Sequence, residues 1–250
     1  MSVLANLAER ARLVRTALTR RYIWTDLTTM VKNHGFELRD VRANVHPLQF
    51  ARQLPSDRRD APPPDFRRLG RGEDFALAQT YAWNSEPTVS EFLGELAWRL
   101  RARTVVELGC YVGWSSAHLA LGLADSGPDA RLWCLDYDAR FLDAARGNLA
   151  RLGLAERVEW VQGLSLDRAT LDRLPREIDL LFIDTSHEYQ ATLDELAAYT
   201  PRIAPGGCIA LHDSLSQDGV RRALAERWSE FATLTFATEF GNGLTILRRS

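Results

Sequence analysis

Two short stretches in the second half of the chain place acids and histidines directly after apolar runs. Asp184 follows one run, with His187 three residues later, and His212 and Asp213 end a second run. Because parallel strands present their carboxyl ends at one edge of a sheet, we expect these side chains to converge. Two carboxylates with an imidazole suit a divalent cation that keeps positions open for substrate oxygens, and a nearby histidine can accept a proton at neutral pH.

Each of these residues also has a purely structural interpretation. Asp184 could cap the helix that follows it, and His187 could be a surface histidine near the start of that helix. His212 and Asp213 could form a structural pair, including a site without metal in which Asp213 only orients His212. Their joint placement at two neighbouring strand ends favours the functional interpretation.

A nucleotide-sized pocket is predicted earlier, where an apolar run ends at Glu107 and a Gly-x-x-x-Gly loop follows. Gly109 allows a sharp turn and a close approach to a ligand, and the helix expected from Ser115 offers unpaired N–H groups. Glu107 would repel a pyrophosphate but suits a ligand with a cationic end. The third glycine of the dinucleotide-binding pattern is absent, which argues against a dinucleotide.

Two later strand ends extend this prediction. Asp136 comes about one βαβ unit after Glu107, where a carboxylate can accept hydrogen bonds from both ribose hydroxyls. The alternative is a solvated turn or a helix N-cap, a role for which Asp138 also qualifies. Gly163 and Leu164 follow the next predicted strand; the glycine permits a close approach and the leucine could cover a ring, although a glycine there often marks only a turn.

Taken in order, these motifs resemble those of the class I S-adenosylmethionine (SAM) methyltransferases, whose first motif is an E/D-x-G-x-x-x-G loop. The resemblance covers roughly residues 86–250 and implies SAM as the cofactor. In that family the loop after the third strand lines the adenine. The cofactor-binding residues implied by the resemblance are Glu107, Gly109, Tyr111, Gly113, Ser115, Asp136, Gly163, Leu164 and Asp184.

The acid and histidine pattern is similar to that of metal-dependent O-methyltransferases, and more closely to the branch that includes macrolide sugar O-methyltransferases. This resemblance implies a metal held by Asp184, His212 and Asp213, with His187 as the general base. The departure is His212, where that pattern has an acid; an imidazole admits manganese or iron as well as magnesium.

The implied reaction is methyl transfer from SAM to a hydroxyl of a small molecule, in specialised metabolism. Three alternatives stay open. The first is a different enzyme on the same scaffold, either a metal-independent methyltransferase or a hydroxylase-like relative. The second is a nucleic-acid methyltransferase that uses the basic N-terminal arm, although the chain lacks the N/D-P-P-Y/F motif used on base amines, and the third is a non-catalytic SAM-binding protein.

The elements that must position these residues alternate regularly from residue 104. Five strands separated by helices are expected, followed by a hairpin at the Gly241-Asn242-Gly243 turn. The fold class is therefore α/β, a Rossmann-like seven-stranded methyltransferase sheet of five parallel strands and a C-terminal antiparallel hairpin. The expected strands span residues 104–108, 131–135, 158–162, 178–183, 207–211, 231–240 and 244–248.

The N-terminal part is predicted to be a separate, mostly helical extension. Helices are expected at residues 3–18, 24–33 and 73–82, and the proline-rich stretch 44–72 is expected to be a linker or lid. We divide the chain into an extension, 1–85, and a methyltransferase domain, 86–250.

The charge distribution indicates which classes of binding partner the chain could have. Residues 1–72 carry 14 Lys and Arg against seven Asp and Glu, although the whole chain has a net charge of −2. Leucines dilute these arginines, so we expect the extension to pack on the acidic body or on a second subunit of a homo-oligomer, not on nucleic acid.

No apolar run approaches the roughly 20 residues of a membrane span. Three cysteines lack metal or disulfide spacing, which favours a cytoplasmic protein.

Overall fold

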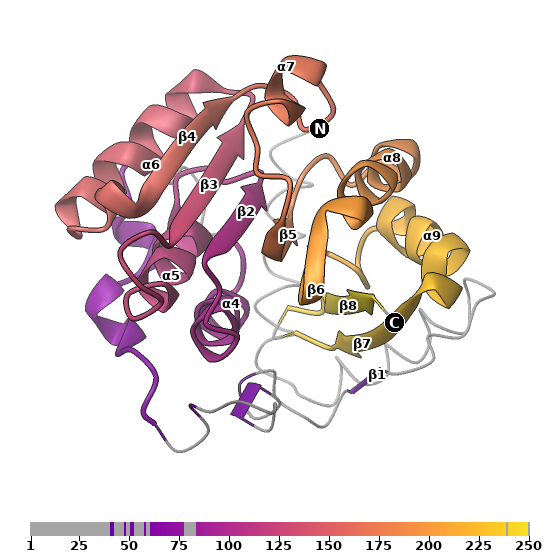
Figure 1. The fold of residues 1–250 in the computed structure, drawn as a ribbon, viewed down its shortest axis with the longest axis horizontal. Coiled ribbons are helices and arrows are strands. Elements are labelled where there is room, and N and C mark those ends of the chain that lie inside the picture. The colour runs from indigo at the N-terminus through magenta and orange to yellow at the C-terminus, as the bar shows by residue number, and fades with distance from the viewer. Residues whose placement is uncertain are drawn as a thin grey trace, which may run out of the picture.

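The computed structural model describes residues 41–42, 48, 51–52, 58, 61–77, 84–238 and 240–249. It contains one sheet with helices on both faces (Figure 1). The strand order is β1-β7-β8-β6-β5-β2-β3-β4. The strands are β1 (Val41–Arg42), β2 (Thr104–Leu108), β3 (Arg131–Asp136), β4 (Val158–Gln162), β5 (Ile178–Ile183), β6 (Ile203–His212), β7 (Phe231–Phe236) and β8 (Leu244–Arg249).

The α-helices mostly lie between successive strands, as parallel pairing requires. They are α4 (Pro87–Arg99), α5 (Trp114–Gly122), α6 (Ala139–Arg151), α7 (Arg168–Leu171), α8 (Tyr189–Tyr199) and α9 (Asp218–Arg227). Short 3-10 turns occupy Phe66–Leu69, Gly72–Asp74, Ala155–Arg157, Thr200–Arg202 and Trp228–Glu230.

Side chains of the central strands alternate between two apolar clusters, one on each face of the sheet. From β5, Leu180 and Phe182 join the cluster formed with α4, α5 and α6. Leu181 and Ile183 join the other cluster, with α8 and α9. This two-residue period buries both faces and explains why residues 180–183 of β5 are all apolar.

The predicted fold class is confirmed, and the expected β2, β4 and β5 have the predicted bounds. β8 pairs antiparallel with both β6 and β7, so the predicted hairpin closes the sheet. The structure adds an eighth strand that we did not predict: the two residues of β1 pair in parallel with β7. A strand this short has no readable periodicity.

The N-terminal predictions are tested only in part. The predicted helices at 3–18 and 24–33 lie outside the described residues. A helix over 73–82 is wrong for its described part, which forms a 3-10 turn at Gly72–Asp74 and then a turn. The reason is tertiary: the Ala76 N–H donates to the Asn148 side chain, 2.9 Å away on α6, and Phe75 packs edge-on against Trp114.

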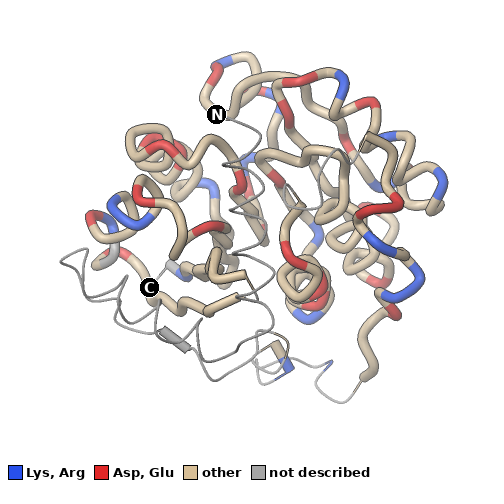
Figure 2. Tube along the Cα trace, turned by 180° about the vertical axis from the view of Figure 1, so that it is seen from behind, with Lys and Arg blue, Asp and Glu red and all other residues tan. Residues whose placement is uncertain are grey.

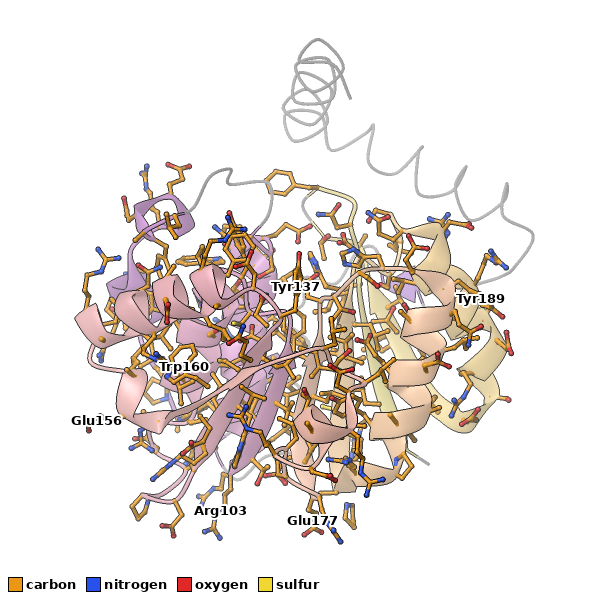
Figure 3. All side chains as sticks on the ribbon, turned by 90° about the horizontal axis from the view of Figure 1, so that it is seen from above. Arg103, Tyr137, Glu156, Trp160, Glu177 and Tyr189 are labelled. Carbon is orange, nitrogen blue, oxygen red and sulfur yellow. The ribbon has the colours of Figure 1, made fainter. Side chains whose placement is uncertain are left out.

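The parallel strands end at one edge of the sheet, and backbone hydrogen bonds tie these ends together. The Gly109 N–H donates to Leu135 O, and the Asp184 N–H donates to Leu108 O, both at 2.9 Å. In Figure 3, Tyr137 after β3 lies toward this edge, opposite Arg103 and Glu177, which precede β2 and β5. The loops after β2, β3, β5 and β6 therefore share one side of the molecule.

Acidic and basic residues are interspersed along the described trace (Figure 2). No helix among the described residues is both long and apolar enough to cross a membrane.

Candidate functional site

The loop after β2 turns sharply against the end of β5. Gly109 has a φ of 86°, and a Cβ placed on it would lie 2.0 Å from the carbonyl oxygen of Asp184. Only glycine fits a left-handed position with backbone this close. Gly113 has a φ of 88°, and there a Cβ would meet Leu149 on α6 at 2.8 Å. Both predicted glycines shape the loop.

Asp136 lies beside this loop at the end of β3. Its Oδ2 accepts from the Tyr111 N–H and its Oδ1 from the Asp138 N–H, both at 3.0 Å. Burial raises the pKa of this carboxyl, although both backbone hydrogen bonds oppose the rise. Each oxygen has a second lone pair for a ligand hydroxyl. The N-cap of α6 is Asp138. Asp136 is therefore not the N-cap, which was the structural alternative to ribose binding.

Glu107 is placed behind the loop and not at its surface. Its side chain is fully buried and accepts hydrogen bonds from the Ser115 and Ser116 hydroxyls, with the Cys134 thiol 3.4 Å away. Burial raises the pKa of this carboxyl to about 7. Glu107 and Ser115 thus join the end of β2 to the start of α5, and the carboxylate lies behind the loop.

The loop after β4 carries the remaining two predicted cofactor residues. A Cβ on Gly163 would lie 2.2 Å from the Thr170 hydroxyl, so the close approach here is made by the chain itself. Leu164 is 57% exposed. Among the described residues, the large apolar side chains that are exposed are Leu77, Tyr137 and Leu164. Tyr137 directly follows β3, and Leu164 lies two residues after the end of β4. The Tyr111 hydroxyl donates to the carbonyl of Leu77.

The predicted acids and histidines do converge. His187 Nε2 lies 3.1 Å from both Asp184 Oδ1 and Asp213 Oδ2. His212 Nδ1 lies 3.4 Å from Asp184 Oδ2 and 3.7 Å from Asp213 Oδ2. These four side chains, from the ends of β5 and β6, therefore surround one point.

Two structural alternatives fail on this geometry. The N-cap residue of α8 is Glu188, so Asp184 does not cap the helix that follows it. Asp213 does not orient His212, because His212 Nδ1 is buried and has no hydrogen-bond partner. Instead, the Ser216 hydroxyl donates to Asp213 at 2.9 Å.

The site is electrostatically coupled. Burial opposes charge on His212, but Asp184 and Glu86 raise its pKa well above the usual value. Burial likewise opposes charge on His187, yet the hydrogen bond to Asp184 and the charges of Asp184 and Asp213 raise its pKa. Burial disfavours the Asp184 carboxylate, but both histidines hold its pKa below the usual range. A positive charge between Asp184 and Asp213 therefore favours the ionised form of both carboxyls.

Asp184, His212 and Asp213 have the donor set of a divalent-cation site. One ligand atom from each lies within 4.8 Å of the other two. The orphaned Nδ1 of His212 faces both carboxylates at 3.4 and 3.7 Å, a position that suits either a proton or a cation between the ring and the two acids. His187 and Asp213 have left-handed backbones, with φ of 61° and 55°. Strained backbone conformations of this kind persist where the surrounding structure holds them in place, and they cluster at functional sites.

Sequence reasoning missed Glu86 and Thr238. Glu86 directly precedes α4, but its side chain makes no capping hydrogen bond to that helix. Instead, Oε2 lies 2.6 Å from His212 Nε2, and the Thr238 hydroxyl donates to Oε1 at 2.7 Å. A glutamate at a position that favours Ser, Thr, Asp or Asn was the one available signal.

Comparisons with known proteins identify the family. A methyltransferase-domain family model matches residues 106–214. The catechol O-methyltransferase of Mycobacterium tuberculosis is 37% identical over 158 residues, which are 59% of this chain and 68% of that enzyme. The catechol O-methyltransferase of Niastella koreensis is 29% identical over 163 residues, 60% of this chain and 70% of that enzyme.

Solved structures show the same fold. The O-methyltransferase TomG of Streptomyces achromogenes, in complex with SAM, aligns with a TM-score of 0.59 and 25% identity, covering 67% of this chain and 82% of that one. An O-methyltransferase of Bacillus cereus in complex with SAH aligns with a TM-score of 0.62 and 24% identity, covering 77% and 95%. The chain therefore belongs to the class I SAM-dependent O-methyltransferases. It is a SAM-dependent enzyme that acts on a small-molecule substrate.

Proposed function

We propose that this O-methyltransferase methylates one of two neighbouring hydroxyls of a small molecule, with a divalent cation held by Asp184, His212 and Asp213 and with His187 as the general base. The observation that carries the proposal is the meeting of these four side chains at the ends of β5 and β6. Relatives that are catechol O-methyltransferases support an acceptor with vicinal hydroxyls.

The cofactor is proposed to lie along the ends of β2, β3 and β4. Asp136 has the lone pairs to accept from both ribose hydroxyls, and the exposed Tyr137 and Leu164 offer apolar surface to the adenine. Gly109, Tyr111 and Gly113 form the loop beside it, and the buried Glu107 and Ser115 hold that loop from behind. Asp184 borders both the cofactor loop and the acid–histidine cluster.

A divalent cation would supply Lewis acidity that lowers the pKa of a bound hydroxyl. The chain's own residues do the rest. Asp184 and Asp213 provide negative charge, and His212 presents Nδ1 to the same point. His187, with a quarter of its side chain exposed, points Nε2 at Asp184 and Asp213; with a cation on these carboxylates in place of its own proton, Nε2 would be free to accept the proton of the acceptor hydroxyl.

The test is a methyl-transfer assay that follows SAH formation with catechol, phenol and a polyol, after chelation and with Mg²⁺, Mn²⁺ or Co²⁺ added back. We expect acceptors with vicinal hydroxyls, such as catechol, to be methylated only when a divalent metal is present. Full activity after chelation would favour the metal-independent alternative, and SAM binding without turnover of any acceptor would favour a non-catalytic or hydroxylase-like protein.

Several expectations from the sequence stay predictions. They are the domain boundary at residue 86, a homo-oligomer built through the extension, the resemblance to macrolide sugar enzymes, a role in specialised metabolism, and a cytoplasmic location. Cys110, Cys134 and Cys208 are buried free thiols.

A further inference from the structure

Glu86 is a buried acid that the proposed reaction does not use. Its side chain is 1% exposed, and both of its oxygens are occupied, one by the His212 ring and the other by the Thr238 hydroxyl. Burying a carboxylate is costly unless it is paired and hydrogen-bonded. The start of α4 does not account for this cost, because the Glu86 side chain makes no capping hydrogen bond to that helix.

The His212 ring joins Glu86 to the proposed cation site. Nε2 faces Glu86 at 2.6 Å, and Nδ1 faces Asp184 and Asp213 at 3.4 and 3.7 Å with no hydrogen-bond partner. In a neutral imidazole, the hydrogen bond made by one nitrogen decides which nitrogen carries the proton. A carboxylate at Nε2 therefore keeps a proton on that nitrogen, so that a cation between Nδ1 and the two acids would meet the Nδ1 lone pair.

Thr238 locks this arrangement to the C-terminal hairpin. Its hydroxyl donates to Glu86 and accepts from the Gly243 N–H at 2.9 Å. The turn between β7 and β8 thus fixes Glu86, and Glu86 fixes His212 at the end of β6. The edge of the Phe182 ring also faces the imidazole, with ring centroids 6.4 Å apart. The ring is held from several sides.

Resting on the proposed cation site, we propose that Glu86 is a positioning residue that holds His212 as an Nδ1 ligand. The site then selects a divalent transition metal over Mg²⁺. An imidazole is a poor ligand for Mg²⁺, whereas Co²⁺, Fe²⁺ and Ni²⁺ bind it readily. An acid behind a metal-binding histidine fixes the tautomer and ring orientation, and loss of such a partner costs about 10–100-fold in metal affinity.

The experiment measures Co²⁺ and Mg²⁺ binding to the full chain by titration calorimetry and by the visible spectrum of bound Co²⁺. The wild type should bind Co²⁺ more tightly than Mg²⁺. Glu86→Leu should weaken Co²⁺ by about 10–100-fold and change its spectrum. Glu86→Gln, whose amide oxygen can still accept a hydrogen bond from Nε2, should lose less Co²⁺ affinity than Glu86→Leu. Glu91→Gln, in the same helix, is the matched control and should leave Co²⁺ binding unchanged.

Two further measurements guard against a variant that merely fails to fold. SAM affinity without metal should be equal in the wild type and in Glu86→Leu. In the Zn²⁺-loaded wild type, long-range ¹H–¹⁵N spectra should show Nδ1 of His212 shifted by the metal and Nε2 protonated.

The failures are distinguishable. A wild type that binds no divalent ion overturns the cation site and this inference with it. A wild type that binds Mg²⁺ as tightly as Co²⁺, a metal on Nε2, or Co²⁺ affinity unaffected by Glu86→Leu overturns this inference alone.

Discussion

His187 and Asp213 meet across two strand ends, with Nε2 of the histidine 3.1 Å from Oδ2 of the aspartate. They follow different strands, β5 and β6, and both have left-handed backbones. The contact therefore depends on the parallel register of β5 and β6, in which Ile183 pairs with Leu211.

Replacing this histidine should separate chemistry from binding. For His187→Ala we expect SAM binding close to that of the wild type and turnover lower by about 10²-fold or more, the usual effect of losing a general base. Steady-state kinetics and calorimetry measure the two quantities. Tyr189→Phe, two residues along, removes an exposed hydroxyl that donates to Glu226 and should leave both unchanged. Turnover that survives His187→Ala would remove the histidine from the mechanism.

Loss of charge at Asp184 should abolish the response to metal. Asp184→Asn keeps the shape of the side chain but removes half of the carboxylate charge of the site. We expect Mn²⁺ binding, followed by electron paramagnetic resonance, to weaken by more than about 100-fold, beyond the effect of losing an outer partner. Asp167→Asn, at an exposed position, is the control. Equal Mn²⁺ affinity in both variants would contradict the cation site.

Much of this arrangement could be predicted because it follows from local pattern. Asp184, His212 and Asp213 each end an apolar strand, and strands that alternate with helices bring such ends to one edge. Glu86 could not be found in this way. It contacts His212 across 126 positions of sequence, from the start of a helix, and only tertiary packing brings the two together. For a related reason the motif fixes the position of Glu107 but not the direction of its side chain, which is buried against Ser115 and Ser116.

The glycine of the first loop is a sharp test of that geometry. Gly109→Ala places a methyl group against the Asp184 carbonyl in a left-handed conformation, so we expect a loss of at least about 3 kcal/mol in the free energy of unfolding. Gly147→Ala is the matched control. It lies in the exposed part of α6 with nothing within 4 Å of a new Cβ, and it should stabilise by up to about 1 kcal/mol. Urea denaturation of both variants measures the difference, and equal stability would contradict the close approach at Gly109.

Glu107 should make stability depend on pH in an unusual direction. Burial raises the pKa of this carboxyl from 4.5 to about 7 in the folded protein. Between these values the folded state keeps a proton that the unfolded state has released, so this group's contribution to stability falls as the pH rises from about 4.5 to about 7. Across that window the loss is on the order of 3 kcal/mol, at 1.36 kcal/mol per unit of pKa.

Glu107→Gln isolates this contribution because the amide is neutral at every pH and the Ser115 and Ser116 hydroxyls can rotate to match it. We expect the free energy of unfolding of the variant, relative to the wild type, to increase steadily from pH 5 to pH 7 and then to level off. Glu156→Gln, on the exposed surface, removes the same charge and should show no such trend. A constant difference between Glu107→Gln and the wild type would mean that the carboxyl is already ionised at pH 5. Its pair of serine donors would then outweigh burial.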